Sequence, residues 1–79
     1  MKKSEFVKQL AEYCEFEGQR FNLDTQFKSI EGYDSMAIMS MIAFTDEKFN
    51  MNLTAQQIVN LTDFKSLIAL IGEDKFEND

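Results

Sequence analysis

The serine hydroxyls are the groups in this sequence whose chemistry depends most on their position. The chain has five of them: Ser4, Ser29, Ser35, Ser40 and Ser66. Ser35 alone follows an acidic residue, Asp34, at the expected start of a helix and after a long connection. A phosphate ester on its hydroxyl would lie near the free amides at the positive end of that helix, which favour an anion. An Asp-Ser pair at a helix start also serves simply as a cap.

Missing residue types exclude several other kinds of site. His is absent, and Cys14 is the one cysteine. The sequence therefore excludes a disulfide framework, a Cys/His zinc site and nucleophilic catalysis through a Ser-His or Cys-His pair. No acidic and basic groups converge at a recognisable catalytic spacing, so we expect neither an enzyme nor a metal site.

The composition indicates one small globular domain over residues 1–79. Apolar residues make up 44% of the chain and charged residues 28%, which separates it from disordered sequences. No apolar run approaches the roughly 20 residues that span a bilayer, and no signal-like apolar stretch follows Met1. We therefore expect a cytoplasmic protein, in which Cys14 stays reduced.

The charge is uneven along the chain, whose formal net charge is −6. Residues 1–33 hold five basic and six acidic side chains, whereas residues 34–79 hold three basic and eight acidic ones. A domain this acidic repels nucleic acid and anionic membranes, and it favours binding to basic protein surfaces. Net negative charge also keeps a small protein soluble without any further role. We expect a monomer that binds neither nucleic acid nor membrane.

The spacing of apolar residues predicts an all-α fold. The expected helices are residues 4–17, capped by Ser4 and stopped by Gly18; residues 35–49, capped by Asp34; a short helix after Thr54; and a last helix from Thr62 or Asp63 to Gly72. Thr54 and Gln57 form a capping-box pattern. Residues 18–33 form a long connection with a short helical turn near residues 25–29. The acidic residues 73–79 are expected to fray.

The helix predicted over residues 35–49 carries two apolar stripes. One comprises Ile38, Met41, Ile42 and Phe49, with Thr45 among them; the other comprises Met36, Met39 and Ala43, beside Ser40, Asp46 and Glu47. At about 100° per residue, the two stripes lie on nearly opposite sides of the helix. Because one side can face the core of so small a domain, we expect the second stripe to bind a partner.

The turn before this helix resembles a known motif. Gly32-Tyr33-Asp34-Ser35-Met36 is similar to the G-x-D-S-[LM] attachment motif of acyl carrier proteins and related peptidyl carriers. The likeness extends upstream to Phe27 and downstream to Asp46-Glu47-Lys48-Phe49, Met51-Asn52-Leu53-Thr54 and Leu61-Thr62-Asp63-Phe64. It covers nearly the whole chain at spacings that resemble those of the family.

The resemblance implies a four-helix acyl-carrier bundle with a long loop between its first two helices. Ser35 would carry 4′-phosphopantetheine, transferred from coenzyme A by a Mg²⁺-using phosphopantetheinyl transferase, and Asp34 would cap the helix and help position that metal. The thiol of the arm would hold an acyl or aminoacyl thioester for acyl-loading and acyl-transferring enzymes, while the carrier itself would catalyse nothing. The cargo is expected between the second and third helices, lined by Ile38, Met41, Ile42, Ile58 and Val59.

One departure from the family pattern narrows this expectation. Carriers of general fatty acid biosynthesis begin the helix with D-S-L-D and carry a further acid on the outer face, whereas this sequence has Ala37 and Ser40 there. We therefore expect a discrete carrier for a dedicated pathway. Its partner surface would comprise Met36, Met39, Ala43, Asp46 and Glu47. The alternative is a carrier-like helical adaptor that is never modified and binds only protein partners.

Overall fold

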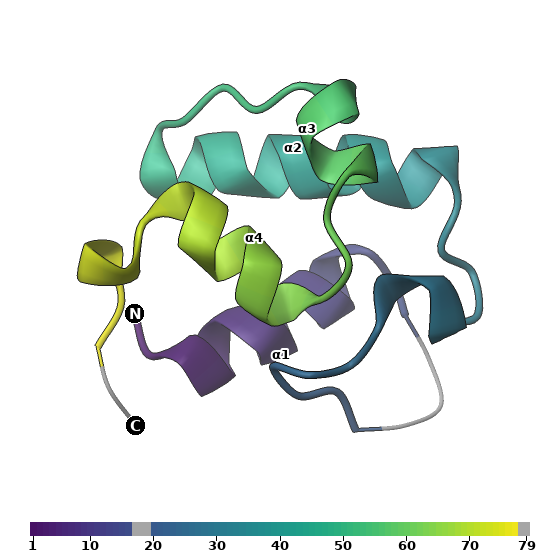
Figure 1. Ribbon diagram of the computed structural model, residues 1–79, viewed down its shortest axis with the longest axis horizontal. Helices are drawn as coiled ribbons and strands as arrows, with labels where there is room; N and C mark the ends of the chain where they lie inside the picture. The colour runs from purple at the N-terminus through teal and green to yellow at the C-terminus, as the bar shows by residue number, and fades with distance from the viewer. Residues whose placement is uncertain (17–19, 78–79) are drawn as a thin grey trace.

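The computed structural model describes residues 1–16 and 20–77 of the protein. Its four α-helices are α1 (Lys3–Tyr13), α2 (Ser35–Phe49), α3 (Ala55–Val59) and α4 (Phe64–Ile71); two short 3-10 turns are η1 (Phe27–Ser29) and η2 (Glu73–Lys75) (Figure 1). The described ranges contain no strand, only two isolated bridges. The all-α, four-helix fold predicted from the sequence is confirmed. None of the helices in these ranges is long and apolar enough to cross a membrane.

Helix α1 is shorter than the sequence pattern predicts. It begins at Lys3 and ends at Tyr13, so the prediction of Ser4 as its cap and of Glu17 as its last residue is wrong. At the start, the Lys2 amide donates a hydrogen bond to Glu5 Oε1 at 3.1 Å. At the end, Glu15 adopts a left-handed conformation with φ 60°, which breaks the helical repeat before Gly18 is reached. Gly18 itself lies outside the described residues.

Helix α2 spans residues 35–49 as predicted, and it lies antiparallel to α1. Phe6 near the start of α1 packs its ring 5.8 Å from that of Phe44 in the second half of α2. Cys14, just after α1, contacts the carbonyl of Ala37 in the first turn of α2. The start of α2 is therefore held against the end of α1, and this pairing fixes where Ser35 stands.

Helices α3 and α4 begin at the caps that the sequence predicts. The Gln57 amide donates to Thr54 Oγ1 at 3.2 Å, and the Thr54 amide donates to Gln57 Oε1 at 2.9 Å, which completes the capping box. Asp63 caps α4 by accepting a hydrogen bond from the Ser66 amide at 2.8 Å. The predicted end of α4 at Gly72 is confirmed, since Gly72 takes a φ of 125° that other residues rarely adopt.

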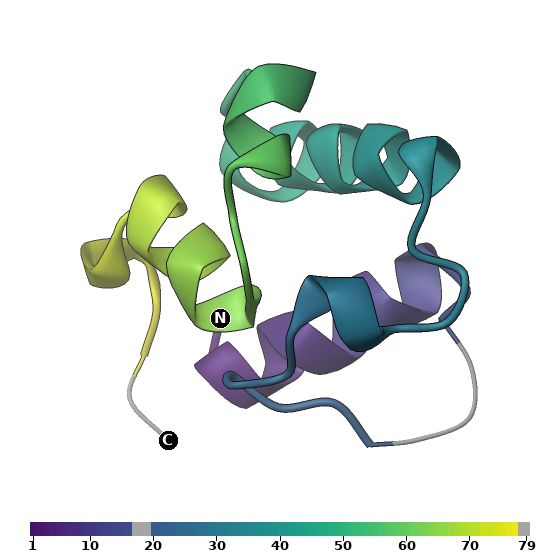
Figure 2. The same ribbon diagram turned by 45° about the vertical axis from the view of Figure 1, so that its right-hand side comes forward.

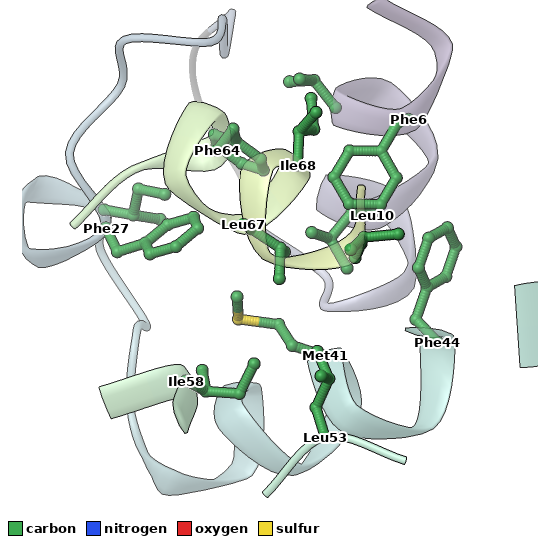
Figure 3. Close-up of a cluster of buried hydrophobic side chains, with 13 residues drawn as sticks. Phe6, Leu10, Phe27, Met41, Phe44, Leu53, Ile58, Phe64, Leu67 and Ile68 are labelled. Atoms are coloured by element: carbon green, nitrogen blue, oxygen red, sulfur yellow. The ribbon is translucent and has the colours of Figure 1, made fainter. Parts of the chain in front are cut away.

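One hydrophobic core joins all four helices. Figures 1 and 2 show α2 and α3 along one side of the molecule, α1 along the other, and α4 between them. The fully buried side chains that fill the space between these elements are Phe6, Leu10, Phe27, Met41, Phe44, Ile58, Phe64, Leu67 and Ile68 (Figure 3). No buried side-chain nitrogen or oxygen in the described part of the chain lacks a hydrogen-bond partner. The helices are thus positioned mainly by close apolar packing.

The acidic segment after α4 contacts the helices through Phe76, whereas Glu73, Asp74, Lys75 and Glu77 are exposed. The ring of Phe76 lies 5.2 Å from that of Phe6 and 5.2 Å from that of Phe49, which ties the chain end to α1 and α2. Lys3 forms an ion pair with Glu73 at 2.6 Å. A half-buried aromatic residue anchors a polar segment because its apolar area is removed from water. The number of acidic residues in the segment does not reveal this contact.

Candidate functional site

Ser35 stands at the first position of the 15-residue helix α2, and its side chain is exposed. Asp34 precedes it in an extended conformation and accepts a hydrogen bond from the Ala37 amide through Oδ1 at 3.0 Å. Gly32 begins the turn with a φ of 89°, and no other group approaches the position that a side chain would take there. The predicted N-cap role of Asp34 is confirmed, and its effect is to fix the direction in which α2 starts.

The turn that bears Ser35 is anchored on η1 and on the segment that follows α1. Tyr33 stacks on Phe27 of η1, with ring centroids 5.4 Å apart and an interplanar angle of 14°. The Phe16 ring lies 6.4 Å from that of Tyr33. The Cys14 thiol donates a hydrogen bond to the Ala37 carbonyl with an Sγ···O distance of 3.9 Å. The spacing of residues in α1 does not predict the contact between Cys14 and Ala37, because it does not reveal that the end of α1 meets the start of α2.

Burial changes the ionisation of the two titratable groups that flank this turn. Desolvation raises the pKa of the Cys14 thiol to about 12, so the thiol is neutral and can donate to Ala37 near neutral pH. Desolvation also raises the pKa of Tyr33, with a smaller contribution from Cys14. A neutral thiol is a poor nucleophile, and the arrangement therefore gives Cys14 a structural role.

The first turn of α2 offers a place for an anion. In any helix the first amides have no carbonyl partner within the helix, and here the Ala37 amide is taken by Asp34. The amides of Ser35 and Met36 remain at the positive end of the helix dipole, beside the exposed hydroxyl. A phosphodiester on this hydroxyl fits the site, because its negative charge would lie beside unpaired donors in an open position.

The other serines are placed differently. The Ser29 hydroxyl donates to the Gln26 carbonyl at 2.7 Å, and the Ser66 hydroxyl donates to the Asp63 carbonyl at 2.7 Å. Ser40 is half-buried in the middle of α2. Among the described residues, no group of three or more acidic, Cys or His side chains gathers in a way that could hold a metal ion. At Ser35 the described part of the chain therefore combines an exposed hydroxyl, the N-cap residue Asp34 and the free amides of the first turn of α2.

The apolar stripe predicted to face away from the core does so. Met36 is 75% exposed and Met39 is 64% exposed, although both are large apolar side chains. Ala43, Asp46 and Glu47 are exposed as well, and they continue the same helix toward its C-terminal end. A row of exposed apolar groups that ends in carboxylates therefore extends along α2 from Ser35.

Three positions on α2 and α3 differ from the placement expected from the sequence. Ala37, assigned to the outer face of α2, is only 4% exposed, because α2 packs against the end of α1 there. Val59, assigned to the inner lining of α3, is 57% exposed, while its neighbour Ile58 takes the inner position. Phe44 is fully buried, although neither apolar stripe included it. The positions on α2 were predicted from the angles around one ideal helix, and these angles do not show on which side α1 packs.

The comparison with known families agrees with the geometry of this site. A family model described as "Phosphopantetheine attachment site" matches residues 4–71, which cover most of the chain. The chain belongs to this family of phosphopantetheine-binding carriers. No curated protein and no solved structure matches the chain at a significant level.

Membership of the family settles the general character of the protein. Its carrier domains are non-catalytic and hold 4′-phosphopantetheine covalently. They interact with phosphopantetheinyl transferases and with enzymes that handle acyl groups. The protein is thus a carrier that presents a prosthetic arm to other enzymes.

Proposed function

We propose that Ser35 is the residue that bears the arm, and that the protein carries acyl or aminoacyl groups as thioesters for a dedicated biosynthetic pathway. The observation that carries the proposal is the exposed Ser35 hydroxyl at the capped start of α2. In the transfer, Ser35 Oγ would form the phosphodiester and lose its proton, and the nucleotide part of coenzyme A would leave. When bound, the arm supplies the thiol on which the cargo is held.

The environment of Ser35 supports attachment without supplying catalysis. The amides of Ser35 and Met36 and the dipole of α2 stabilise a negative charge next to the hydroxyl. Asp34 holds the first turn in place through its hydrogen bond to the Ala37 amide, and its second carboxylate oxygen is available to a metal ion held by the transferase. We assign Asp34 the role of positioning Ser35 and of helping to place that ion.

The row of Met36, Met39 and Ala43 with Asp46 and Glu47 is the surface that we propose for enzyme docking. It borders Ser35, so an enzyme that reaches the arm must approach it. Exposed methionines adapt to differently shaped partners, and a rim of acids favours basic partner surfaces. The first turns of α2 carry no acid after Asp34, which supports a dedicated set of partners over the enzymes of general fatty acid biosynthesis.

Intact mass measurement tests the assignment of Ser35. The unmodified protein is incubated with coenzyme A, Mg²⁺ and a broad-specificity phosphopantetheinyl transferase, and one arm should be added to each chain. Ser35→Ala should gain no mass, whereas the control Ser40→Ala should gain one arm. Circular dichroism should show that all three proteins have the same helical content.

The same experiment separates the proposal from the adaptor alternative. A wild-type chain that stays unmodified beside a second carrier that the transferase does modify would favour an adaptor that binds proteins through Met36 and Met39. Modification that persists in Ser35→Ala would show that the arm is attached to another residue.

A further inference from the structure

Five aromatic rings form a closed circuit beside the start of α2. Tyr33 packs on Phe27 and on Phe16, with ring centroids 5.4 Å and 6.4 Å away. Phe64 of α4 packs on Phe27 at 5.0 Å and on Phe21 at 6.3 Å. Phe16 and Phe21 close the circuit at 6.0 Å. Rings at such separations stabilise one another beyond the area that they bury, so the circuit joins the connection between α1 and α2 to the start of α4.

Two members of the circuit form its fixed base. Phe27 of η1 and Phe64 of α4 are both 0% exposed in the core (Figure 3). The backbone joins the same two elements. The Phe27 amide donates to the Thr62 carbonyl at 2.8 Å, and the Lys65 amide donates to the Leu23 carbonyl at 3.0 Å. This base stays in place because its movement would expose apolar area and leave backbone groups unpaired.

Tyr33 joins this base to the start of α2. Its ring lies nearly parallel to that of Phe27, with an interplanar angle of 14°, and its amide donates to the Ile30 carbonyl at 3.2 Å. Gly32, just before it, has no side chain, and no atom beyond its chain neighbours lies within 4 Å of the position that a Cβ would take. The half-buried Tyr33 ring is therefore the side-chain contact that holds the turn immediately before Asp34 and Ser35.

We propose that Tyr33 is a positioning residue for arm transfer, and that its stacked ring fixes where Ser35 Oγ stands before a docked transferase. In the transfer this oxygen forms the bond to phosphorus, the hydroxyl proton is lost and the nucleotide part of coenzyme A leaves. A misplacement of about 1 Å can cost about 100-fold in such a step, because the reacting atoms must be aligned. Asp34 and Cys14 contact Ala37, on the far side of Ser35, so they do not replace the stack. The inference rests on the proposed function and adds a residue that acts through its ring.

The kinetics of arm transfer test this role. Tyr33→Phe keeps the stacked ring, whereas Tyr33→Leu keeps apolar bulk without it. Tyr13→Leu is the matched control, because Tyr13 packs its ring 5.4 Å from that of Phe44 and is not a member of the circuit. Below the melting range of every variant, Tyr33→Leu should lower kcat at least about fivefold and leave KM within about twofold, because the docking surface on α2 is intact. Tyr33→Phe and Tyr13→Leu should keep the wild-type kcat within about twofold. Retention of kcat in Tyr33→Leu, or an equal loss in Tyr33→Phe, would overturn the inference.

Amide hydrogen exchange of the unmodified protein gives a second readout. The Ala37 and Ile38 amides donate to Asp34, and Tyr33→Leu should speed their exchange about two- to tenfold relative to that of Phe44, since aromatic contacts of the turn are lost. Tyr33→Phe should exchange as the wild type does, and unchanged exchange in Tyr33→Leu would contradict the proposed role. The wild-type Tyr33 amide should exchange at least about tenfold more slowly than in an unstructured peptide; equal rates would overturn the inference even if Tyr33→Leu did not fold. A wild-type chain that gains no arm would instead refute the proposed function.

Discussion

Two methionines of α2, two residues apart in the sequence, should respond in opposite ways to the same substitution. Met39 is 64% exposed beside Ser35, whereas Met41 is 0% exposed in the core. Met39→Ala should therefore slow the transfer of the arm with little loss of stability. Met41→Ala should lower stability severely.

The magnitudes follow from the buried fractions. Complete burial of a methionine contributes about 1.5–3 kcal/mol, and about a third of Met39 is buried in the free protein, so Met39→Ala costs at most about 1 kcal/mol of stability. If docking buries the rest, the substitution removes about 1–2 kcal/mol of binding, or roughly 5–30-fold in kcat/KM. Met41→Ala should cost about 2–5 kcal/mol, because it also leaves a cavity.

The assay combines thermal melting with the rate of arm transfer. In a domain of this size 1 kcal/mol corresponds to about 4–8 °C, so Met41→Ala should lower Tm by at least about 8 °C. Transfer is measured as kcat/KM with a phosphopantetheinyl transferase, below the melting range of every variant. Asp46→Asn is the control for charge at the rim of the surface, and it should cost only about 0–1 kcal/mol of docking energy.

Two results would refute this reasoning. If Met39→Ala melts as low as Met41→Ala, Met39 belongs to the core and is not a docking residue. If Met39→Ala leaves transfer unchanged while Asp46→Asn slows it, the docking surface is electrostatic and the exposed methionines have another role.

Three further experiments test the packing of α1, α2 and the C-terminal segment. Phe76→Ala should lower the free energy of unfolding by about 1–3 kcal/mol, since Phe76 packs on Phe6, and an unchanged Tm would show that the chain end is loose. Ala37→Asp should cost at least about 2 kcal/mol at pH 7, while Ala43→Asp on the exposed face of α2 should be nearly neutral. The loss from Ala37→Asp should shrink as the pH falls to about 4, because the buried carboxyl keeps its proton in the folded state while the unfolded chain ionises; equal loss at both pH values would contradict burial of the side chain. Cys14 should react with a thiol reagent at pH 8 at least about tenfold more slowly in the native protein than in urea, given its pKa of about 12, and equal rates would contradict burial of the thiol.

The sequence predicted the elements whose boundaries depend on local chemistry. Asp34, Thr54 and Asp63 each satisfy amides within their own first turn, so the starts of α2, α3 and α4 could be located from residue types alone. The predicted exposure of Met36 and Met39 is also confirmed, since the periodicity of α2 separates them from Met41.

The placements that the sequence did not predict depend on contacts between segments distant in sequence. Ala37 is buried because the end of α1 crosses the first turn of α2, and Phe76 is anchored because its ring meets those of Phe6 and Phe49. No local pattern encodes either contact. The end of α1 was misjudged because Glu15 takes the left-handed conformation that glycine usually supplies.

Location of the arm on a single peptide tests the central claim most directly. Trypsin should release residues 29–48 of the modified protein as one peptide, which contains Ser29, Ser35 and Ser40 together. Tandem mass spectrometry of that peptide should place the mass of 4′-phosphopantetheine on every fragment that includes Ser35 and on no fragment that lacks it. The arm on Ser29 or Ser40, or on a different peptide, would contradict the account.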